Sequence, residues 1–252
     1  MKYKDLPVGA KFYLGSLRLP NREPIDLMWT KVTQTGKAVL RPGTVNVKFD
    51  ETENWRGNRD RASHGWNAYF QSNVHQWLNS DEVTWFKPKH DTDQVGYHES
   101  RIQGFLLSFT EKERAFLLKF DVTQHSPMGS IKQFGRQVTE SVYAALPAEI
   151  EIFQDAPYSE EGEYIPMLAN REVFYGWLRT GGSGNNHAKY KDFYSAYATD
   201  MFCNDTRTVC PMIMISDKMT ISDKCDADNT YYAKVQDNGI LSNKIMEKYL
   251  IL

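Results

Sequence analysis

Short apolar segments separated by turn residues mark the N-terminal part of the chain. Ala10–Leu14 follows the turn Pro7-Val8-Gly9, and Asp26–Val32 and Lys37–Leu40 flank the turn Thr35-Gly36. Segments of this length, bounded by glycine and proline, are typical of antiparallel strands. The pattern therefore predicts a small β-meander.

Two later stretches change to helical spacing. Between Trp66 and Leu78 the apolar residues recur at i, i+3 and i+4, and Ser72 is placed to cap a helix that begins near Asn73. The second stretch, Phe105–Phe120, contains Thr110 and Glu113 at the spacing of a capping box. We expect two early helices here.

The most distinctive stretch runs from Val173 to Ile215. It begins with an aromatic segment, continues through a glycine- and asparagine-rich loop, and ends in the apolar segment Val209–Ile215. This pattern predicts a strand, a long irregular excursion and a return strand. Long loops of this kind in compact domains are often functional.

Helices and short strands do not alternate along the chain as in βαβ units, so we expect the α+β class. Residues 1–217 are interpreted as one domain and residues 218–252 as a C-terminal extension. Within the extension, Thr230–Val235 is expected to form one more strand, and Leu241–Leu252 a terminal helix. That helix would dock on its own domain or on a neighbouring copy.

Composition excludes several classes of partner. The chain has 252 residues, of which 41% are hydrophobic and 25% charged, with a formal net charge of -2. Such a balance does not indicate a nucleic-acid-binding surface. No apolar run approaches the length of a membrane span, so we expect no membrane insertion. The N-terminus has no apolar signal-peptide core, and we expect synthesis in a reducing cytosol.

Aromatic residues are frequent, at 13% of the chain. One interpretation is packing in a β-rich core, and the other is a recognition surface, where tyrosine is enriched among small polar residues. The second interpretation applies to the segment Arg179–Asp205. The candidate recognition residues there are Arg179, Asn185, Asn186, Tyr190, Tyr194, Tyr197, Asn204 and Asp205.

Motifs for catalysis or metal binding are not recognisable. The three cysteines, Cys203, Cys210 and Cys225, form no CxxC pair. No P-loop, dinucleotide fingerprint, nucleophile elbow or EF-hand spacing is present. The polar group His90, Asp91, Asp93 and His98 matches no closed metal site. We therefore predict no catalytic residue, no metal and no cofactor.

Four motifs in order suggest a family. They are Gly9–Gly15 (G-x-x-F-x-x-G) with Trp29–Val32 (W-x-x-V), Tyr69–Asn79 (Y-x-x-S-x-x-x-x-W-L-N), Gly104–Leu106 (G-F-L), and Trp177–Arg179 (W-L-R) with Val209–Pro211. On these motifs, residues 5–217 resemble an uncharacterised domain family of Firmicutes and their phages. Its layout is similar to the C-type-lectin-like fold of formylglycine-generating enzymes and phage variable tropism proteins. The chain departs from the family at Cys210, where the family has arginine before proline.

The resemblance implies a non-enzymatic phage virion protein: a receptor-binding, baseplate or capsid-decoration subunit. Such a protein would be located in the virion after synthesis in the host cytoplasm. Its expected partners are further copies of itself, other virion proteins and a host-surface glycan. Two alternatives remain open. Asn204-Asp205 resembles part of a lectin calcium site, which would give a calcium-dependent carbohydrate-binding module. Cys203 and Cys210 would be the reactive pair of a formylglycine-generating type of enzyme.

Overall fold

The computed structural model describes residues 1–19, 23–50, 64–83, 85, 103–124, 138–154, 162–184, 186–223 and 225–234. The candidate residue Asn185, the polar group at His90–His98 and the expected helix Leu241–Leu252 lie outside these ranges.

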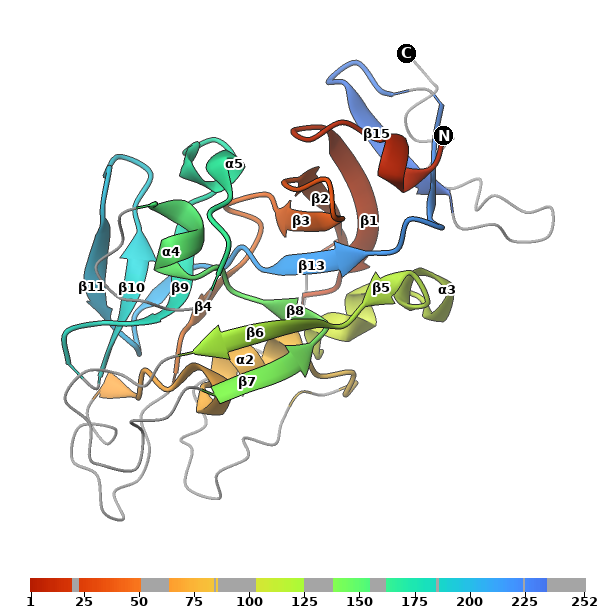
Figure 1. The fold of residues 1–252 in the computed structure, drawn as a ribbon. Coiled ribbons are helices and arrows are strands. Elements are labelled where there is room, and N and C mark those ends of the chain that lie inside the picture. Colours follow the sequence, from red (N-terminus) through yellow and green to blue (C-terminus); the bar gives the residue numbers. More distant parts are fainter. Residues whose placement is uncertain are drawn as a thin grey trace.

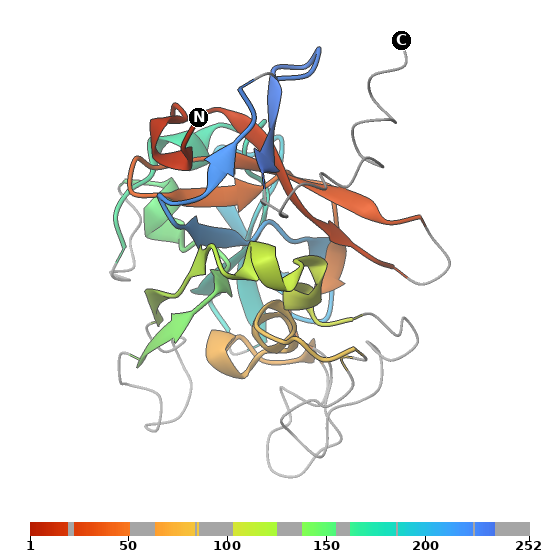
Figure 2. The ribbon, with the colours of Figure 1, turned by 90° about the vertical axis from the view of Figure 1, so that its right-hand side faces the viewer.

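The largest element is an eight-stranded sheet that curls into a half-barrel (Figures 1 and 2). Its order is β14-β15-β1-β2-β3-β13-β5, and β8 also pairs with β13. The pairing is antiparallel except between β1 and β15, so the sheet is mixed. The strands are β1 (Lys11–Leu17), β2 (Ile25–Lys31), β3 (Lys37–Leu40), β5 (Leu117–Leu118), β8 (Ala144–Ala145), β13 (Met212–Ile215), β14 (Thr220–Ile221) and β15 (Thr230–Lys234).

The N-terminal meander predicted from the sequence is confirmed as β1, β2 and β3. A register shift between Tyr13 and Ser16 marks a bulge in β1 beside Gly15, whose φ is 80°. A side chain there would collide with the ring of Phe109 and the carbonyl of Ser108, 2.8 Å from the Cβ position. Glycine thus allows β1 to bend closely over the helical segment beneath it.

The described residues also form three smaller antiparallel sheets. They are β12 (Thr206–Thr208) with β4 (Asn46–Lys48), β6 (Phe120–Gln124) with β7 (Val138–Val142), and β9 (Gly176–Gly181), β10 (His187–Lys191) and β11 (Ala198–Phe202) in the order β11-β10-β9. The last sheet corrects the prediction of a long irregular excursion. Residues 187–191 alternate in burial as a strand does, and the glycine-rich segment before them is the turn of a hairpin.

The helices in the described segments are all short. They are the 3-10 helices η1 (Tyr3–Asp5), η2 (Tyr69–Gln71) and η4 (Phe105–Ser108), and the α-helices α2 (Asn73–Leu78), α3 (Glu111–Arg114), α4 (Glu149–Ile152) and α5 (Pro166–Ala169). The two predicted starts are confirmed: the Ser72 hydroxyl accepts from the His75 N–H, and Thr110 and Glu113 form a capping box. The prediction of one helix over Phe105–Phe120 is wrong, because the chain returns to strands β5 and β6 after Arg114.

Among the described residues, more than half of the aromatic side chains are buried. One cluster joins Trp29, Trp77, Phe105 and Phe109 below the main sheet, with ring centroids 5.3–6.4 Å apart. The core-packing interpretation of these aromatics is thus confirmed for the tryptophans here. Among the described residues the structure is mostly β with few short helices, so the expected α+β class is confirmed only in part.

The described part of the C-terminal extension joins the main sheet. β15 pairs in parallel with β1, and the buried side chains of Met219 and Ile221 belong to the same hydrophobic core as the N-terminal residues. Among the described residues, no helix has both the length and the apolar character needed to cross a bilayer.

Candidate functional site

Arg179 lies in the interior, which removes it from the predicted recognition surface. Its side chain is 1% exposed. The guanidinium donates to the Thr123 carbonyl at 3.2 Å, to the Leu146 carbonyl at 2.8 Å and to the Glu151 carboxylate at 2.6 Å. These hydrogen bonds give the buried guanidinium the partners that a buried charge needs, and they connect β9 to β6 and α4.

The partner of Arg179 is equally buried. Burial alone would raise the pKa of the Glu151 carboxyl, but the charges of Arg179 and Lys37 and the N–H of Ala148 outweigh it, and the pKa lies below its ordinary value. Glu151 is therefore an ionised member of a buried pair.

Tyr190 also points inward. It is 9% exposed and packs edge-on against the Trp177 indole, with ring centroids 5.6 Å apart. Burial raises the pKa of its hydroxyl, with Asp192 acting in the same direction. Tyr190 therefore contributes to packing of the β9–β11 sheet.

The remaining candidates lie at two opposite ends of the hairpin β10–β11. The register pairs His187 with Phe202 at one end and Lys191 with Ala198 at the other. Asn186, Asn204 and Asp205 flank the first end, while Tyr194 and Tyr197 lie in the turn at the second. Four residue steps of a strand separate the ends by about 13 Å, so the structure does not gather these residues into one site.

A groove lies beside the turn that carries the two tyrosines. Its volume is about 620 Å³. It is bordered by α4, by α5 and Arg171 just after it, and by the turn between β10 and β11. These elements are neighbours in Figure 1. We call this cavity the aromatic groove. Its lining residues are Glu149, Ile152, Phe153, Gln154, Tyr164, Ala169, Arg171, Lys191, Phe193, Tyr194, Ser195, Ala196, Tyr197 and Ala198.

Two exposed tyrosines form part of the groove lining. Tyr194 is 88% exposed and Tyr197 is 78% exposed. Their backbone is fixed locally: the Tyr194 N–H donates to the Asp192 carboxylate at 2.8 Å, and the Tyr197 N–H donates to the Ser195 hydroxyl at 3.1 Å. The turn therefore presents two aromatic rings to solvent from a hydrogen-bonded backbone.

Aromatic contacts continue from the turn toward the protein. Phe193 packs edge-on against Tyr194 at 5.0 Å and against Tyr175 at 5.5 Å. The Arg171 guanidinium lies over the Phe193 ring at 5.2 Å. These contacts anchor the exposed turn to the segment after α5.

The inner wall of the groove contains two buried ionisable groups. Lys191 is 2% exposed, and its ammonium donates to the carbonyls of Ala169 at 3.3 Å and Phe174 at 2.9 Å. Burial lowers the pKa of Lys191. Glu149 is 7% exposed, and its Oε2 atom has no hydrogen-bond partner among the described residues. Burial raises the pKa of this carboxyl, Lys189 opposes the shift and Asp200 adds to it.

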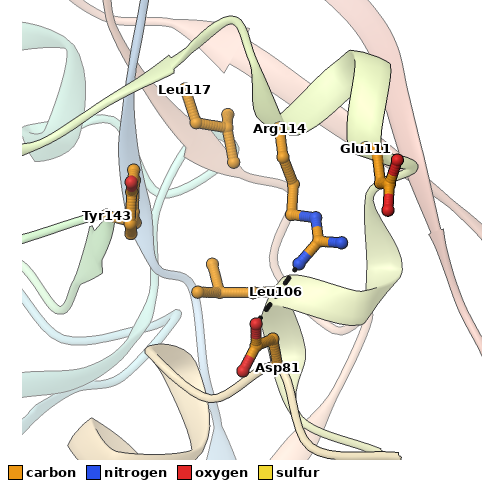
Figure 3. A pocket seen from close by; sticks show the side chains of 6 residues that line it. All are labelled: Asp81, Leu106, Glu111, Arg114, Leu117 and Tyr143. Atoms are coloured by element: carbon orange, nitrogen blue, oxygen red, sulfur yellow. Dashed lines mark ion pairs between the residues drawn. The ribbon is translucent and has the colours of Figure 1, made fainter.

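A second, smaller pocket of about 310 Å³ lies between α3, β5 and the turn after β7. Figure 3 shows the Arg114 side chain extending toward Asp81, with which it forms an ion pair at 3.5 Å. Leu106, Leu117 and Tyr143 supply the other walls. No buried side-chain polar atom in its described lining lacks a hydrogen bond. The aromatic groove is therefore the stronger candidate site.

The residues that the two alternative functions would use are the cysteines and Asp205, and their surroundings are as follows. Cys203 and Cys210 are buried, and only Cys225 of the three thiols is exposed. The Cys210 thiol donates to the Tyr175 carbonyl at 3.1 Å, and burial raises its pKa. Asp205 pairs with Arg207 at 3.3 Å. In the described part of the chain, no three His, Cys, Asp or Glu side chains form a group that could hold a metal ion.

No protein-family model, curated protein or solved structure matches this chain. The family resemblance therefore rests on the sequence motifs alone.

Sequence reasoning identified the tyrosines of the groove but missed its opposite wall. Glu149 and Arg171 precede the tyrosines by more than twenty residues, and neither belongs to a recognisable motif. Only the packing of α4 and α5 against the β9–β11 sheet brings them beside the turn.

Proposed function

We propose that this protein is a non-enzymatic virion structural protein that recognises its partner through the aromatic groove. In this proposal it is a receptor-binding, baseplate or capsid-decoration subunit with a C-type-lectin-like layout. The virion assignment is supported by the motif resemblance, and the recognition role by the geometry of the groove.

The observation that carries the recognition role is the exposure of Tyr194 and Tyr197 beside a cavity. Isolated exposed aromatics are common on protein surfaces, but two rings on one fixed turn, next to a groove, are typical of binding sites. Tyrosine contributes a large contact area and loses little side-chain entropy when it is ordered. Small polar neighbours such as Ser195 complete this composition.

The test is binding of the purified chain to cell envelopes from a panel of Firmicutes species, measured by co-sedimentation. We expect binding to at least one envelope, and a loss of at least about tenfold in affinity for the double variant Tyr194→Ala/Tyr197→Ala, because central aromatic residues dominate binding energies. Tyr143→Ala is the control, since it removes a tyrosine from the smaller pocket. Binding that the double variant retains in full would contradict the proposal.

A further inference from the structure

We propose that the aromatic groove binds an uncharged glycan without calcium, with Glu149 accepting hydrogen bonds from sugar hydroxyls while Tyr194 and Tyr197 pack against sugar rings. This inference rests on the proposed recognition function and names the chemistry of its ligand.

The first argument is the unsatisfied acceptor. A buried carboxylate oxygen without a hydrogen bond costs the desolvation of that oxygen, and native structures rarely leave such groups unpaired. Glu149 Oε2 is such an atom, on a side chain that lines the groove. The terminal torsion of a glutamate is broad and roughly two-fold, so rotation about it can exchange the positions of the two carboxylate oxygens within the groove lining. A ligand that donates hydrogen bonds would satisfy it.

The second argument is charge. The ionisable lining of the groove comprises one acid, Glu149, and two bases, Lys191 and Arg171, apart from tyrosines. An ammonium ligand would meet a net positive lining and is disfavoured. An anionic ligand at the inner wall would be repelled by Glu149. Lys191 on that wall already donates to two backbone carbonyls, and the Arg171 guanidinium lies over the Phe193 ring. The complementary donor is therefore an uncharged hydroxyl group.

The third argument is shape. Exposed aromatic rings offer flat apolar faces, and a sugar ring has one face made mainly of C–H groups and an edge of hydroxyls. A ligand of this kind can cover Tyr194 or Tyr197 while it donates to the carboxylate at the inner wall. Because the protein supplies its own acceptor, no metal ion is required for the hydroxyl contacts.

The experiment uses the full chain on an array of neutral, acidic and amino-sugar glycans, in buffer containing a chelator. We expect binding to neutral glycans, with Kd measured by calorimetry on the best of them. Tyr194→Ala and Glu149→Gln should each weaken binding by about tenfold or more. The amide of Glu149→Gln keeps the size of the side chain but replaces one acceptor oxygen with a donor.

The matched control is Glu172→Gln, which makes the same charge change at an exposed residue outside the groove lining. It should leave Kd unchanged. Glu149→Gln should fold at least as stably as the wild type, because the buried carboxylate is disfavoured in its charged form. A loss of binding in this variant would then not reflect unfolding.

Three results would overturn the inference: binding only with calcium, binding only to acidic or amino-sugar glycans, or an unchanged Kd for Glu149→Gln. Periodate oxidation of the envelopes separates this failure from failure of the proposed function. Envelope binding that resists periodate, but is lost on protease treatment and in Tyr194→Ala/Tyr197→Ala, would leave the recognition role intact and replace the glycan by a protein partner.

Discussion

At the scale of single residues, two glutamates close together in sequence have opposite roles. Glu151 is paired with Arg179 at 2.6 Å and its pKa is lowered, whereas one oxygen of Glu149 has no hydrogen-bond partner among the described residues and the pKa of Glu149 is raised. The difference follows from direction, since α4 turns Glu151 into the core and Glu149 toward the groove. Glu151 therefore stabilises the fold, and Glu149 costs stability and is available to a ligand.

Replacing Glu151 by glutamine should lower the free energy of unfolding by about 3 to 5 kcal/mol at pH 7, because the Arg179 charge would remain buried without its counter-ion. Since the folded-state pKa of Glu151 is below its ordinary value of 4.5, its contribution is fully present above about pH 4.5 and is lost as the pH falls through the folded-state pKa. The stability gap between wild type and Glu151→Gln should narrow over that acid range. Urea unfolding as a function of pH measures this.

The ion pair Arg114–Asp81, whose side chains are 30% and 69% exposed, provides the control for that measurement. Asp81→Asn breaks it and should cost less than about 1 kcal/mol, since solvent screens exposed ion pairs. If Glu151→Gln were as mild as Asp81→Asn, the buried pair would not have the structural role that we assign to it.

At the scale of elements, local sequence signals determine where a helix begins, whereas contacts between distant segments determine whether a segment forms a strand or a loop. The caps at Ser72 and Thr110 could be predicted because each acts within one turn of its helix. Strands β10 and β11 could not, since their residues also fit a polar loop until strand pairing is known. Arg179 was misplaced for the same reason: its partner Glu151 is distant in sequence and gives no local signal.

The strands β14 and β15 contribute to the stability of the main sheet. β15 pairs with the edge of β1, and the Tyr232 ring stacks on Tyr13 with ring centroids 5.3 Å apart. The side chains of Met219, just before β14, and Ile221 are fully buried. A chain that ends at Ser216 should therefore lose about 3 to 6 kcal/mol from these two apolar side chains alone, which lowers the melting temperature by about 6 to 24 °C. Calorimetry on this chain, beside one that ends at Lys234, tests the expectation. Equal melting temperatures would contradict it.

At the scale of the whole molecule, some features of the fold could be predicted from the sequence and others could not. The short, mainly antiparallel strands follow from the spacing of apolar residues, and the described residues confirm them. The α+β class is confirmed only in part, since these residues form a mostly β structure with few short helices. The parallel pairing of β1 with β15 joins the two ends of the described chain and has no local signal. In the aromatic groove, the tyrosines could be predicted because they stand out by composition. The residues of its inner wall could not, because only the fold brings them beside the tyrosines.

The aromatic groove is the central claim, and hydroxyl-radical footprinting of the envelope-bound protein tests it most directly. Tyr194 and Tyr197 are the exposed tyrosine rings of the groove, at 88% and 78% exposure, so both should oxidise readily in the free protein. On envelopes that bind the chain, we predict strong protection of both rings, with no change at the exposed side chain of Val83. Protection of other surfaces while Tyr194 and Tyr197 oxidise at the free rate would contradict the account.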